Sequence, residues 1–343
     1  MKQSFLLELP NGPFGDPLIV LRLRWLPRVL LLDAGDTGCL GPRTLLETTD
    51  VLISHYHMDH IFGLGRLLRL RLGREERPLR LFGPPGLHHR ITAHLRSYEW
   101  NLVDAYPIDL SIFEVHPHHT ELWRFPSEHG FDPEFITRGP GPDEEPVFTD
   151  DLLSIEAHLF DHGSTISAAW RVREHRSYHV DTTHLEQMGH EPGPWLARIK
   201  SEFRRDPDSE TLVRLPDGTR MSLTELRDSL IRICEGDCLV YATDISPTEE
   251  NLSRLAFFAT GARRLAIETH FSNDHVNLAR EHGHLTAALA GKVARQAGVH
   301  AVCPFHFSPR YENDGERLFS ELKKTASPVS IEDLPLGPRP SAG

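Results

Sequence analysis

Residues 51–64 read VLISHYHMDHIFGL, with three histidines and one aspartate within six positions between two apolar runs. In an extended segment residues i and i+2 lie on the same side, so His55 and His57 are able to reach one metal ion together. Asp59 and His60 follow at the entry to a helix and point elsewhere, toward a second ion. The alternative is a solvated loop in a chain with 22 histidines. It is disfavoured, because chance assembly of H-x-H-x-D-H is roughly below one in a hundred.

One such motif does not complete the coordination of two ions, so further ligands are expected where other strand patterns end. The runs LLSIEAHLF, CLVYAT and AVCPF lead to His162, Asp244 and His306, and active-site groups of such sheets gather at the carboxyl ends of strands. We predict that His162 completes the first site, that His306 completes the second, and that Asp244 bridges the ions. The predicted ligand set is His55, His57, Asp59, His60, His162, Asp244 and His306.

The predicted cofactor is a pair of divalent metal ions. A mixed histidine and aspartate set suits Zn²⁺ and tolerates Mn²⁺ or Fe²⁺. Paired ions of this kind hold a hydroxide at neutral pH and stabilise both the attacking and the leaving oxygen of a displacement. The motif therefore predicts hydrolytic chemistry, without naming the substrate.

Composition sets outer bounds on the function. The chain has 343 residues, of which 39% are hydrophobic and 25% charged, as in an ordinary globular protein. A formal net charge of −12 argues against a general polyanion binder. Four cysteines without a C-x-x-C pair predict no disulfide framework, which favours a reducing, cytoplasmic setting. No segment approaches the length needed to cross a bilayer, so no membrane partner is expected.

The order of patterns along the chain predicts an α/β sandwich rather than a simple doubly wound sheet, since short strands are followed by strand–helix alternation. We expect a single hydrolase domain over residues 1–330. Residues 114–150 contain breaker signals such as HPHH and are interpreted as a loop-rich insertion. Residues 174–236 form an arm-like segment, and residues 331–343 form a disordered tail.

An ordered set of segments resembles the metallo-β-lactamase-fold hydrolases, and among them the ribonuclease Z family. The resemblance covers about residues 30–313, and its segments are SHYHMDHIFGLGRLL, LFGPPG, IEAHLFDHG, CLVYATDISP, IETHFSNDH, REHGHLTAALAGKVA and FHFSPRY. The metal motif indicates only the superfamily, whereas the ordered set is more specific. It implies an αββα sandwich of the metallo-β-lactamase type.

The resemblance also implies a reaction, namely endonucleolytic cleavage at the 3′ ends of tRNA precursors by metal-bound hydroxide. His284 would protonate the leaving 3′-oxygen, and as a histidine in a predicted strand-to-helix loop it suits proton donation. Glu268 would orient His284, with a buried structural carboxylate as the open alternative. Asp59 would both hold a metal ion and orient the attacking water.

Substrate contacts are less specific in the sequence. Basic candidates for RNA backbone contact are Arg66, Arg69, Arg71, Arg74, Lys200, Arg204 and Arg205, and a solvated basic face explains the first four equally well. The segment SAAWRVRE departs from the Gly-Tyr-Arg pattern of the family, and ELPNGPFGDPLIV departs from its N-terminal loop. Two other functions therefore stay open: hydrolysis of a small phosphodiester or cyclic nucleotide, and non-catalytic RNA binding on the same fold. A homodimer also stays open.

Overall fold

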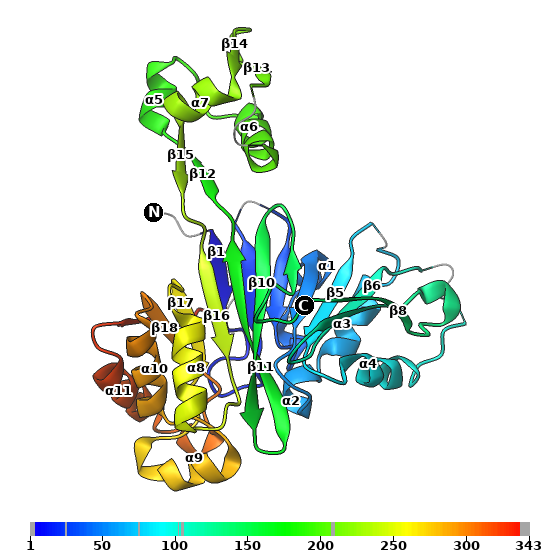
Figure 1. The fold of residues 1–343 in the computed structure, drawn as a ribbon, viewed down its shortest axis with the longest axis vertical. Coiled ribbons are helices and arrows are strands. Elements are labelled where there is room, and N and C mark those ends of the chain that lie inside the picture. Colours follow the sequence, from blue (N-terminus) through cyan, green and yellow to red (C-terminus); the bar gives the residue numbers. More distant parts are fainter. Residues whose placement is uncertain are drawn as a thin grey trace. The chain divides into compact units, whose positions relative to one another are not determined.

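Apolar runs in the first part of the chain form one sheet with the strand order β1-β2-β3-β4-β5-β6-β7-β8 (Figure 1). The computed structural model describes residues 4–24, 26–74, 76–101, 103, 106–206 and 210–336. Strands β3 to β6 are parallel, and every residue of β3 and β4 is buried, as expected of strands covered on both faces. The strands are β1 (Phe5–Glu8), β2 (Ile19–Leu23), β3 (Val29–Leu32), β4 (Thr48–Leu52), β5 (Leu79–Gly83), β6 (Leu110–Val115), β7 (Thr120–Arg124) and β8 (Glu134–Gly139).

The predicted insertion at residues 114–150 differs from expectation, because much of it continues this sheet. Strands β7 and β8 pair antiparallel at its edge. All but the last residue of β8 are exposed. An exposed edge strand lacks the apolar run of a buried one, so its sequence reads as loop.

A second sheet has the strand order β19-β18-β17-β16-β11-β10-β9. Strands β16 to β19 are parallel, and every residue of β16, β17 and β18 is buried. The strands are β9 (Phe148–Thr149), β10 (Leu153–His162), β11 (Thr165–Glu174), β16 (Cys238–Ala242), β17 (Arg264–Glu268), β18 (Ala301–Phe305) and β19 (Ser330–Ile331). The expected tail at 331–343 is thus ordered at its start, where Leu334 is buried and Pro335 accepts a hydrogen bond from the Leu9 amide. Residues 337–343 lie outside the described residues.

Helices cover the outer face of each sheet, and the two inner faces meet (Figure 1). Helices α1, α3 and α4 pack their leucines on the first sheet, and α8, α10 and α11 pack on the second. Across the inner faces, Nε1 of Trp170 on β11 donates to the carbonyl of Ile53, 3.2 Å away. This confirms the αββα sandwich. The helices of this part are α1 (Pro42–Glu47), α2 (Met58–Ile61), α3 (Leu64–Arg71), α4 (Leu87–Leu95), α8 (Glu249–Ala259), α9 (Val276–His282), α10 (Ala287–Ala297) and α11 (Gly315–Ala326), with short 3-10 turns η1 (Thr37–Cys39), η3 (Ser127–His129), η4 (Asn273–His275) and η5 (Pro309–Tyr311).

Local sequence signals fix both ends of helix α10 and allow its close packing against α11. Oγ1 of Thr286 accepts from the Leu289 amide at its N-terminus, and Gly298 ends the helix in the left-handed conformation. A Cβ added at Gly291 would lie 2.0 Å from Oγ1 of Thr325 on α11. A side chain at this position would therefore separate the two helices.

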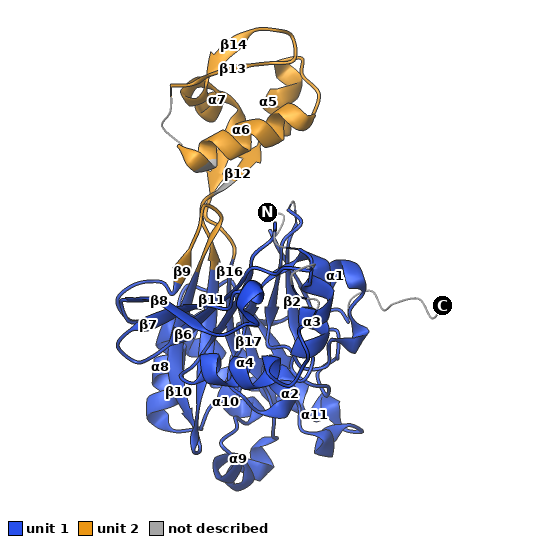
Figure 2. Cartoon of the chain, turned by 90° about the vertical axis from the view of Figure 1, so that its right-hand side faces the viewer, with its two compact units in different colours: residues 1–147, 155–172, 238–343 blue, residues 148–154, 173–237 orange. Residues whose placement is uncertain are grey.

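The chain divides into two compact units (Figure 2). Unit 1 comprises residues 1–147, 155–172 and 238–343, and unit 2 comprises residues 148–154 and 173–237. Unit 2 contains the whole predicted arm-like segment, and it has a hydrophobic cluster of its own that includes Phe203 and Leu226. Its further elements are β12 (Ser177–Val180), α5 (Thr182–Gln187), α6 (Pro194–Arg205), β13 (Leu212–Arg214), β14 (Arg220–Ser222), α7 (Leu223–Leu230) and β15 (Ile231–Cys234). Among the residues that the structure describes, none of the helices has both the length and the apolar character that a bilayer crossing requires.

Candidate metal centre

All seven predicted ligands belong to unit 1, and the structure brings them together at strand ends. His55 and His57 follow β4, Asp59 and His60 lie on the short helix α2, His162 is the last residue of β10, and Asp244 and His306 follow β16 and β18. The expected placement at carboxyl ends of strands is confirmed.

Among the described residues, three of the four non-glycine residues with a positive φ angle lie at strand ends around this site. Asp33, Asp244 and His306 have φ angles of 57°, 54° and 54°. Non-glycine residues in this region cost on the order of 1–3 kcal/mol each and persist only where the surrounding structure holds them. Each of the three immediately follows a strand or lies one residue beyond it, so the strain turns a side chain into the site.

The first group of side chains contains His55, His57, His162 and Asp244, whose candidate ligand atoms all lie within 4.8 Å of one another. Oδ2 of Asp244 lies 3.4 Å from Nε2 of His55 and 3.5 Å from Nε2 of His162. Three imidazoles thus converge with one carboxylate, and such a donor set suits Zn²⁺.

The second group contains Asp59, His60 and His306, again with candidate ligand atoms within 4.8 Å. Nε2 of His60 lies 3.5 Å from Oδ2 of Asp59 and 3.7 Å from Oδ2 of Asp244. Nε2 of His306 lies 3.7 Å from Oδ2 of Asp59. Oδ2 of Asp244 therefore borders both groups, in the position that a bridging ligand requires.

Two ring nitrogens in the cluster show that the site fits a metal ion. Nε2 of His55 and Nε2 of His60 are buried, and neither has a hydrogen-bond partner among the described residues. A buried polar atom without a partner costs about 1–3 kcal/mol. A divalent cation between these groups would satisfy both nitrogens, so the residues present fit a bound metal ion.

Hydrogen bonds on the opposite ring nitrogens present Nε2 to the site. Nδ1 of His60 donates to Oδ2 of Asp33 over 2.7 Å, and Nδ1 of His162 donates to the carbonyl of Gly283 over 2.9 Å. Each Nε2 then carries a lone pair, because a neutral imidazole has one donor and one acceptor nitrogen. A Cβ at Gly283 would lie 2.9 Å from Nδ1 of His162, so only glycine leaves room for this bond.

Asp33 is a functional residue that the sequence analysis missed. Besides His60, its fully buried carboxylate accepts from the amide and hydroxyl of Ser54 and from the hydroxyl of Tyr241, 2.6 Å away. It connects the strand ends of both sheets. Asp33 ends the apolar run VLLLD, so the rule that selected Asp244 would also have found it.

Burial and mutual charge set the protonation of the cluster. Burial, with help from His60, lowers the pKa of His55 to about 2, so this ring is neutral and free to coordinate. Burial alone would lower the pKa of His306, but the charge of Asp244 and a hydrogen bond to it raise that pKa well above its usual value. Protons and metal ions therefore compete for His306, and metal affinity falls as the pH falls.

His284 and Glu268 lie beside the two groups. Nδ1 of His284 donates to Oε2 of Glu268 over 2.8 Å, and Oε1 of the fully buried Glu268 accepts from the amide of Ile245. The carboxylate therefore both orients His284 and holds the backbone next to Asp244. Burial alone would lower the pKa of His284, but the charge and hydrogen bond of Glu268 raise it.

The predicted local setting of His284 needs one correction. It lies in the turn between α9 and α10, not in a strand-to-helix loop. Helix α9 precedes His284, and Gly283 in the left-handed conformation ends that helix.

His270 is a second residue that the sequence analysis missed. Its ring stacks on the ring of His284 with centroids 4.0 Å apart and planes 7° from parallel, and its Nδ1 donates to the carbonyl of His306. Burial lowers its pKa to about 2. His270 lies between Thr269 and Phe271 in IETHFSNDH, one of the segments that resemble the family. The signal available in the sequence was that this histidine falls in such a segment, as His284 and His306 do.

A cleft of about 580 Å³ opens onto these groups, and its lining includes His57, His162, His270, His284 and Arg310. Two members of the first ligand group, His57 and His162, therefore line one cleft together with the His284 ring. A phosphodiester in this cleft would meet the proposed metal ligands and a proton donor together.

The predicted basic contacts lie in different settings. Arg66 donates to the carbonyls of Thr37 and Leu40, and the fully buried Arg71 donates to four main-chain carbonyls. Both guanidinium groups tie loops of unit 1 together, whereas Arg69 and Arg74 are exposed.

The other basic candidates belong to unit 2 and lie on α6. They are the half-buried Lys200, Arg204, whose side chain lies outside the described part of the chain, and the exposed Arg205, which pairs with Glu202.

The αββα arrangement with its histidine–aspartate cluster defines a metallo-β-lactamase-fold hydrolase. The chain is 30% identical over 305 residues to ribonuclease Z of Deinococcus radiodurans, covering 88% of each chain. It is 30% identical over 324 residues to ribonuclease Z of Shouchella clausii, covering 92% of this chain and 89% of that protein. The chain belongs to the ribonuclease Z family and is a metal-dependent hydrolase, as the sequence motifs predict. No protein-family model matches the chain.

Solved structures support the same fold. The metallo-β-lactamase-fold protein YhfI from Bacillus subtilis aligns with a TM-score of 0.53 and 14% identity, covering 96% of each chain. Unliganded yeast PDE1 aligns with a TM-score of 0.54 and 11% identity, covering 96% of this chain and 98% of that one. At these identities the likeness concerns the fold alone.

Proposed function

We propose that this protein is a dinuclear-metal phosphodiesterase that acts as an endonuclease on the 3′ ends of tRNA precursors. The observation that carries the proposal is the pair of ligand groups that share Oδ2 of Asp244 beside the His284–Glu268 pair. The curated relatives named ribonuclease Z support the substrate class.

The seven ligand residues would hold two divalent ions, with Zn²⁺ as the expected metal. The group of His55, His57, His162 and Asp244 would hold one ion, and Asp59, His60 and His306 would hold the other. Bound there, the ions would supply water activation and neutralisation of the charge that develops on the phosphate.

The protein's own side chains would direct the reaction around these ions. Asp59 is 44% exposed at its carboxylate. Burial alone would raise its pKa, but a hydrogen bond from His306 and the charge of His60 keep that pKa below its usual value. An ionised, accessible carboxylate in this place would accept a hydrogen bond from the attacking water and orient it.

His284 would act as the general acid. Glu268 raises the pKa of His284, so the ring keeps its proton to a higher pH than an ordinary imidazole, and it borders the cleft. It would donate the proton from Nε2 to the leaving 3′-oxygen, because Nδ1 is engaged with Glu268. His270, stacked on it, would keep the ring in place.

The test compares two substrates, a tRNA precursor with a 3′ extension and bis-p-nitrophenyl phosphate. We expect metal-dependent cleavage of both, with a new 3′-hydroxyl at the mature end of the tRNA. Cleavage of the small ester alone would contradict the tRNA assignment in favour of a small phosphodiester. Binding of the precursor without cleavage of either substrate would favour the non-catalytic alternative.

The oligomeric state is part of the same proposal. We propose a homodimer, in which unit 2 of one chain contributes to tRNA binding at the site of the other. Light scattering on the purified protein, with and without precursor tRNA, distinguishes this from a monomer that binds tRNA by itself. Deletion of residues 174–236 should then abolish tRNA cleavage while cleavage of the small ester persists.

A further inference from the structure

The hairpin of β6 and β7 carries a second cluster of metal-binding side chain types. Its sequence at residues 114–121 is EVHPHHTE. Glu114 pairs with Glu121 in the sheet register, and the His116 amide donates to the His119 carbonyl over 2.9 Å. Because side chains alternate between faces along each strand, these two glutamates and two histidines share one face of the hairpin. Four oxygen and nitrogen donors thus come from eight consecutive residues.

The donor atoms are spaced as ligands of one ion. Candidate ligand atoms of His116, His119 and Glu121 all lie within 4.8 Å of one another. Nε2 of His119 lies 3.3 Å from Oε1 of Glu121, and Nε2 of His116 lies 3.8 Å from Oε2. Donors about 2.0–2.2 Å from a tetrahedral zinc ion are on the order of 3.4 Å apart. Small rotations of the stacked rings, whose centroids are 4.3 Å apart, would complete the geometry.

Glu114 adjoins this group without belonging to it, since its candidate ligand atom groups within 4.8 Å with those of His88 and Glu121. Oε1 of Glu114 lies 3.0 Å from Nε2 of His116, and the Glu114 side chain is only 2% exposed. Its other oxygen accepts from the amide and from Nδ1 of His88, at the start of α4. Glu114 is therefore held in place from outside the hairpin, as a carboxylate next to a metal site often is.

One atom in the cluster points to a missing ligand. Nε2 of His116 is buried, and within the described ranges of the chain it has no hydrogen-bond partner. The Glu121 carboxylate has partners without a metal ion, because it accepts a hydrogen bond from Arg138 over 2.7 Å and one from Nε1 of Trp123 over 3.2 Å. Nε2 of His116 lies within ion-pair distance of Glu114 and Glu121, at 3.0 Å and 3.8 Å, but forms no hydrogen bond with either. A cation between these groups satisfies it.

We propose that His116, His119 and Glu121, with Glu114 as the fourth donor, bind one zinc ion that fastens the β6–β7 hairpin. The site shares no residue with the seven ligands of the candidate metal centre. Its donor set is two imidazoles and two carboxylates, which suits zinc and leaves no position open for catalysis. Its role is structural, because it joins both strands of the hairpin next to their turn.

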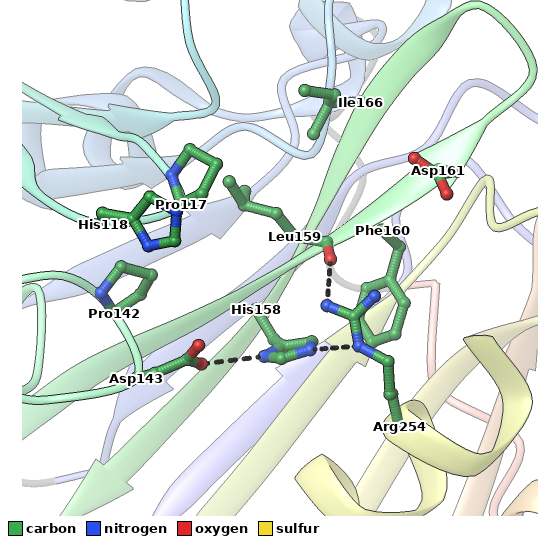
Figure 3. Close-up of a pocket in the computed structure, with 10 residues that line it drawn as sticks. All are labelled: Pro117, His118, Pro142, Asp143, His158, Leu159, Phe160, Asp161, Ile166 and Arg254. Carbon is green, nitrogen blue, oxygen red and sulfur yellow. Dashed lines mark hydrogen bonds and ion pairs between the residues drawn. The ribbon is translucent and has the colours of Figure 1, made fainter. Parts of the chain in front are cut away.

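The turn between the two histidines offers a matched control. Pro117 and His118 line a separate pocket of about 320 Å³ with Asp143, His158 and Arg254, and Figure 3 shows His118 beside Pro117 and Pro142 there. The polar groups of that pocket already pair with one another, since His158 contacts both Asp143 and Arg254. His118 is thus a histidine of the same turn that lies outside the proposed zinc site.

The first experiment counts zinc. Untagged protein is stripped of metal, reloaded with Zn²⁺, dialysed against metal-free buffer and analysed by mass spectrometry for zinc per chain. We expect the double variant H116A/H119A to retain one zinc fewer than wild type, and H118A to retain as many as wild type. In an H55A/H57A background, the same double change should again remove one zinc. Equal zinc content in wild type and H116A/H119A would overturn the proposal, and so would an equal loss in H118A.

A second measurement needs no variant and so does not depend on how the variants fold. Histidine modification by diethyl pyrocarbonate is mapped in wild-type protein with and without Zn²⁺. Zinc should slow modification of His116 and His119 and leave His118 unchanged. Equal modification of His116 and His119 in both conditions would overturn the proposal. Neither experiment reads phosphodiesterase activity, so failure of the proposed function would leave these outcomes intact.

Discussion

Two histidine-rich segments of unit 1, residues 54–60 and 114–121, look alike in the sequence and differ in how the fold surrounds them. Around residues 54–60, the further donors come from the ends of β10, β16 and β18, and buried Asp33 orients His60 from the end of β3. Around residues 114–121, all four proposed donors come from one hairpin, and Arg138 and Trp123 already hold Glu121.

The difference separates a reactive site from a structural one. The centre built from strand ends opens into a cleft beside a proton donor, whereas the hairpin cluster joins two neighbouring strands. Changes in the first should affect the reaction, and changes in the second should affect only metal content. The following predictions test that separation.

The largest effect is expected from Asp244→Ala. Asp244 borders both ligand groups, so its loss should abolish metal-dependent cleavage of bis-p-nitrophenyl phosphate and remove bound zinc from the centre. Asp161→Ala is the matched control, because Asp161 is an exposed aspartate beside His162 and should leave cleavage unchanged. Full activity in Asp244→Ala would contradict the ligand assignment.

A smaller loss is expected from His284→Ala. Removing a general acid slows a reaction by about 10²–10⁴-fold, while zinc content should stay at the wild-type level because His284 belongs to neither ligand group. Single-turnover cleavage of precursor tRNA and zinc analysis on the same preparation provide the measurement. An unchanged rate would exclude His284 from the mechanism.

Asp33→Asn tests the residue that orients His60. The amide keeps the size of the carboxylate but removes its charge, and loss of such an outer partner costs about 10–100-fold in metal affinity or activity. Competition with a zinc-binding dye measures the affinity. Unchanged affinity would show that Asp33 serves only to join the strand ends.

Glu268→Gln should move the pH profile more than the maximal rate. Glu268 raises the pKa of His284, and cleavage needs His284 protonated, so the rate falls as the pH rises through that pKa. Without the carboxylate charge the pKa falls, and the alkaline limb of the profile should shift to lower pH. An unshifted limb would leave Glu268 as a structural carboxylate that holds the Ile245 amide.

The smallest effect on the reaction is expected from the hairpin. H116A/H119A should cleave bis-p-nitrophenyl phosphate at the wild-type rate even though it loses one zinc, because its residues lie outside both ligand groups and outside the cleft lining. A rate that falls together with the zinc content would show that the two clusters are coupled. The two clusters would then not be separate reactive and structural sites.

The ligand set was readable because four members share one closely spaced motif and the other three each end or follow an apolar run. Buried parallel strands need continuous apolar residues, so a polar residue directly after such a run marks a strand end, as at His162 and Asp244. The basic pattern at Arg66 and Arg71 was less informative, because a helical basic pattern has the same appearance whether its guanidinium groups meet solvent, RNA or carbonyl oxygens. Strands β7 and β8 and the separate core of unit 2 were hidden for a similar reason, since short or exposed strands carry little hydrophobic pattern.

The amino-acid sequence alone determined the class of chemistry, an α/β sandwich and the positions of the seven proposed ligands, because these follow from local spacing and apolar periodicity. The αββα type followed from the resemblance to the metallo-β-lactamase-fold hydrolases. Only the tertiary structure decided that Asp33 orients His60, that His270 stacks on His284, and that one face of a hairpin gathers two glutamates and two histidines. Those relations join residues from different elements or depend on ring orientation. Their energies come from burial and contact geometry, which local sequence patterns do not encode.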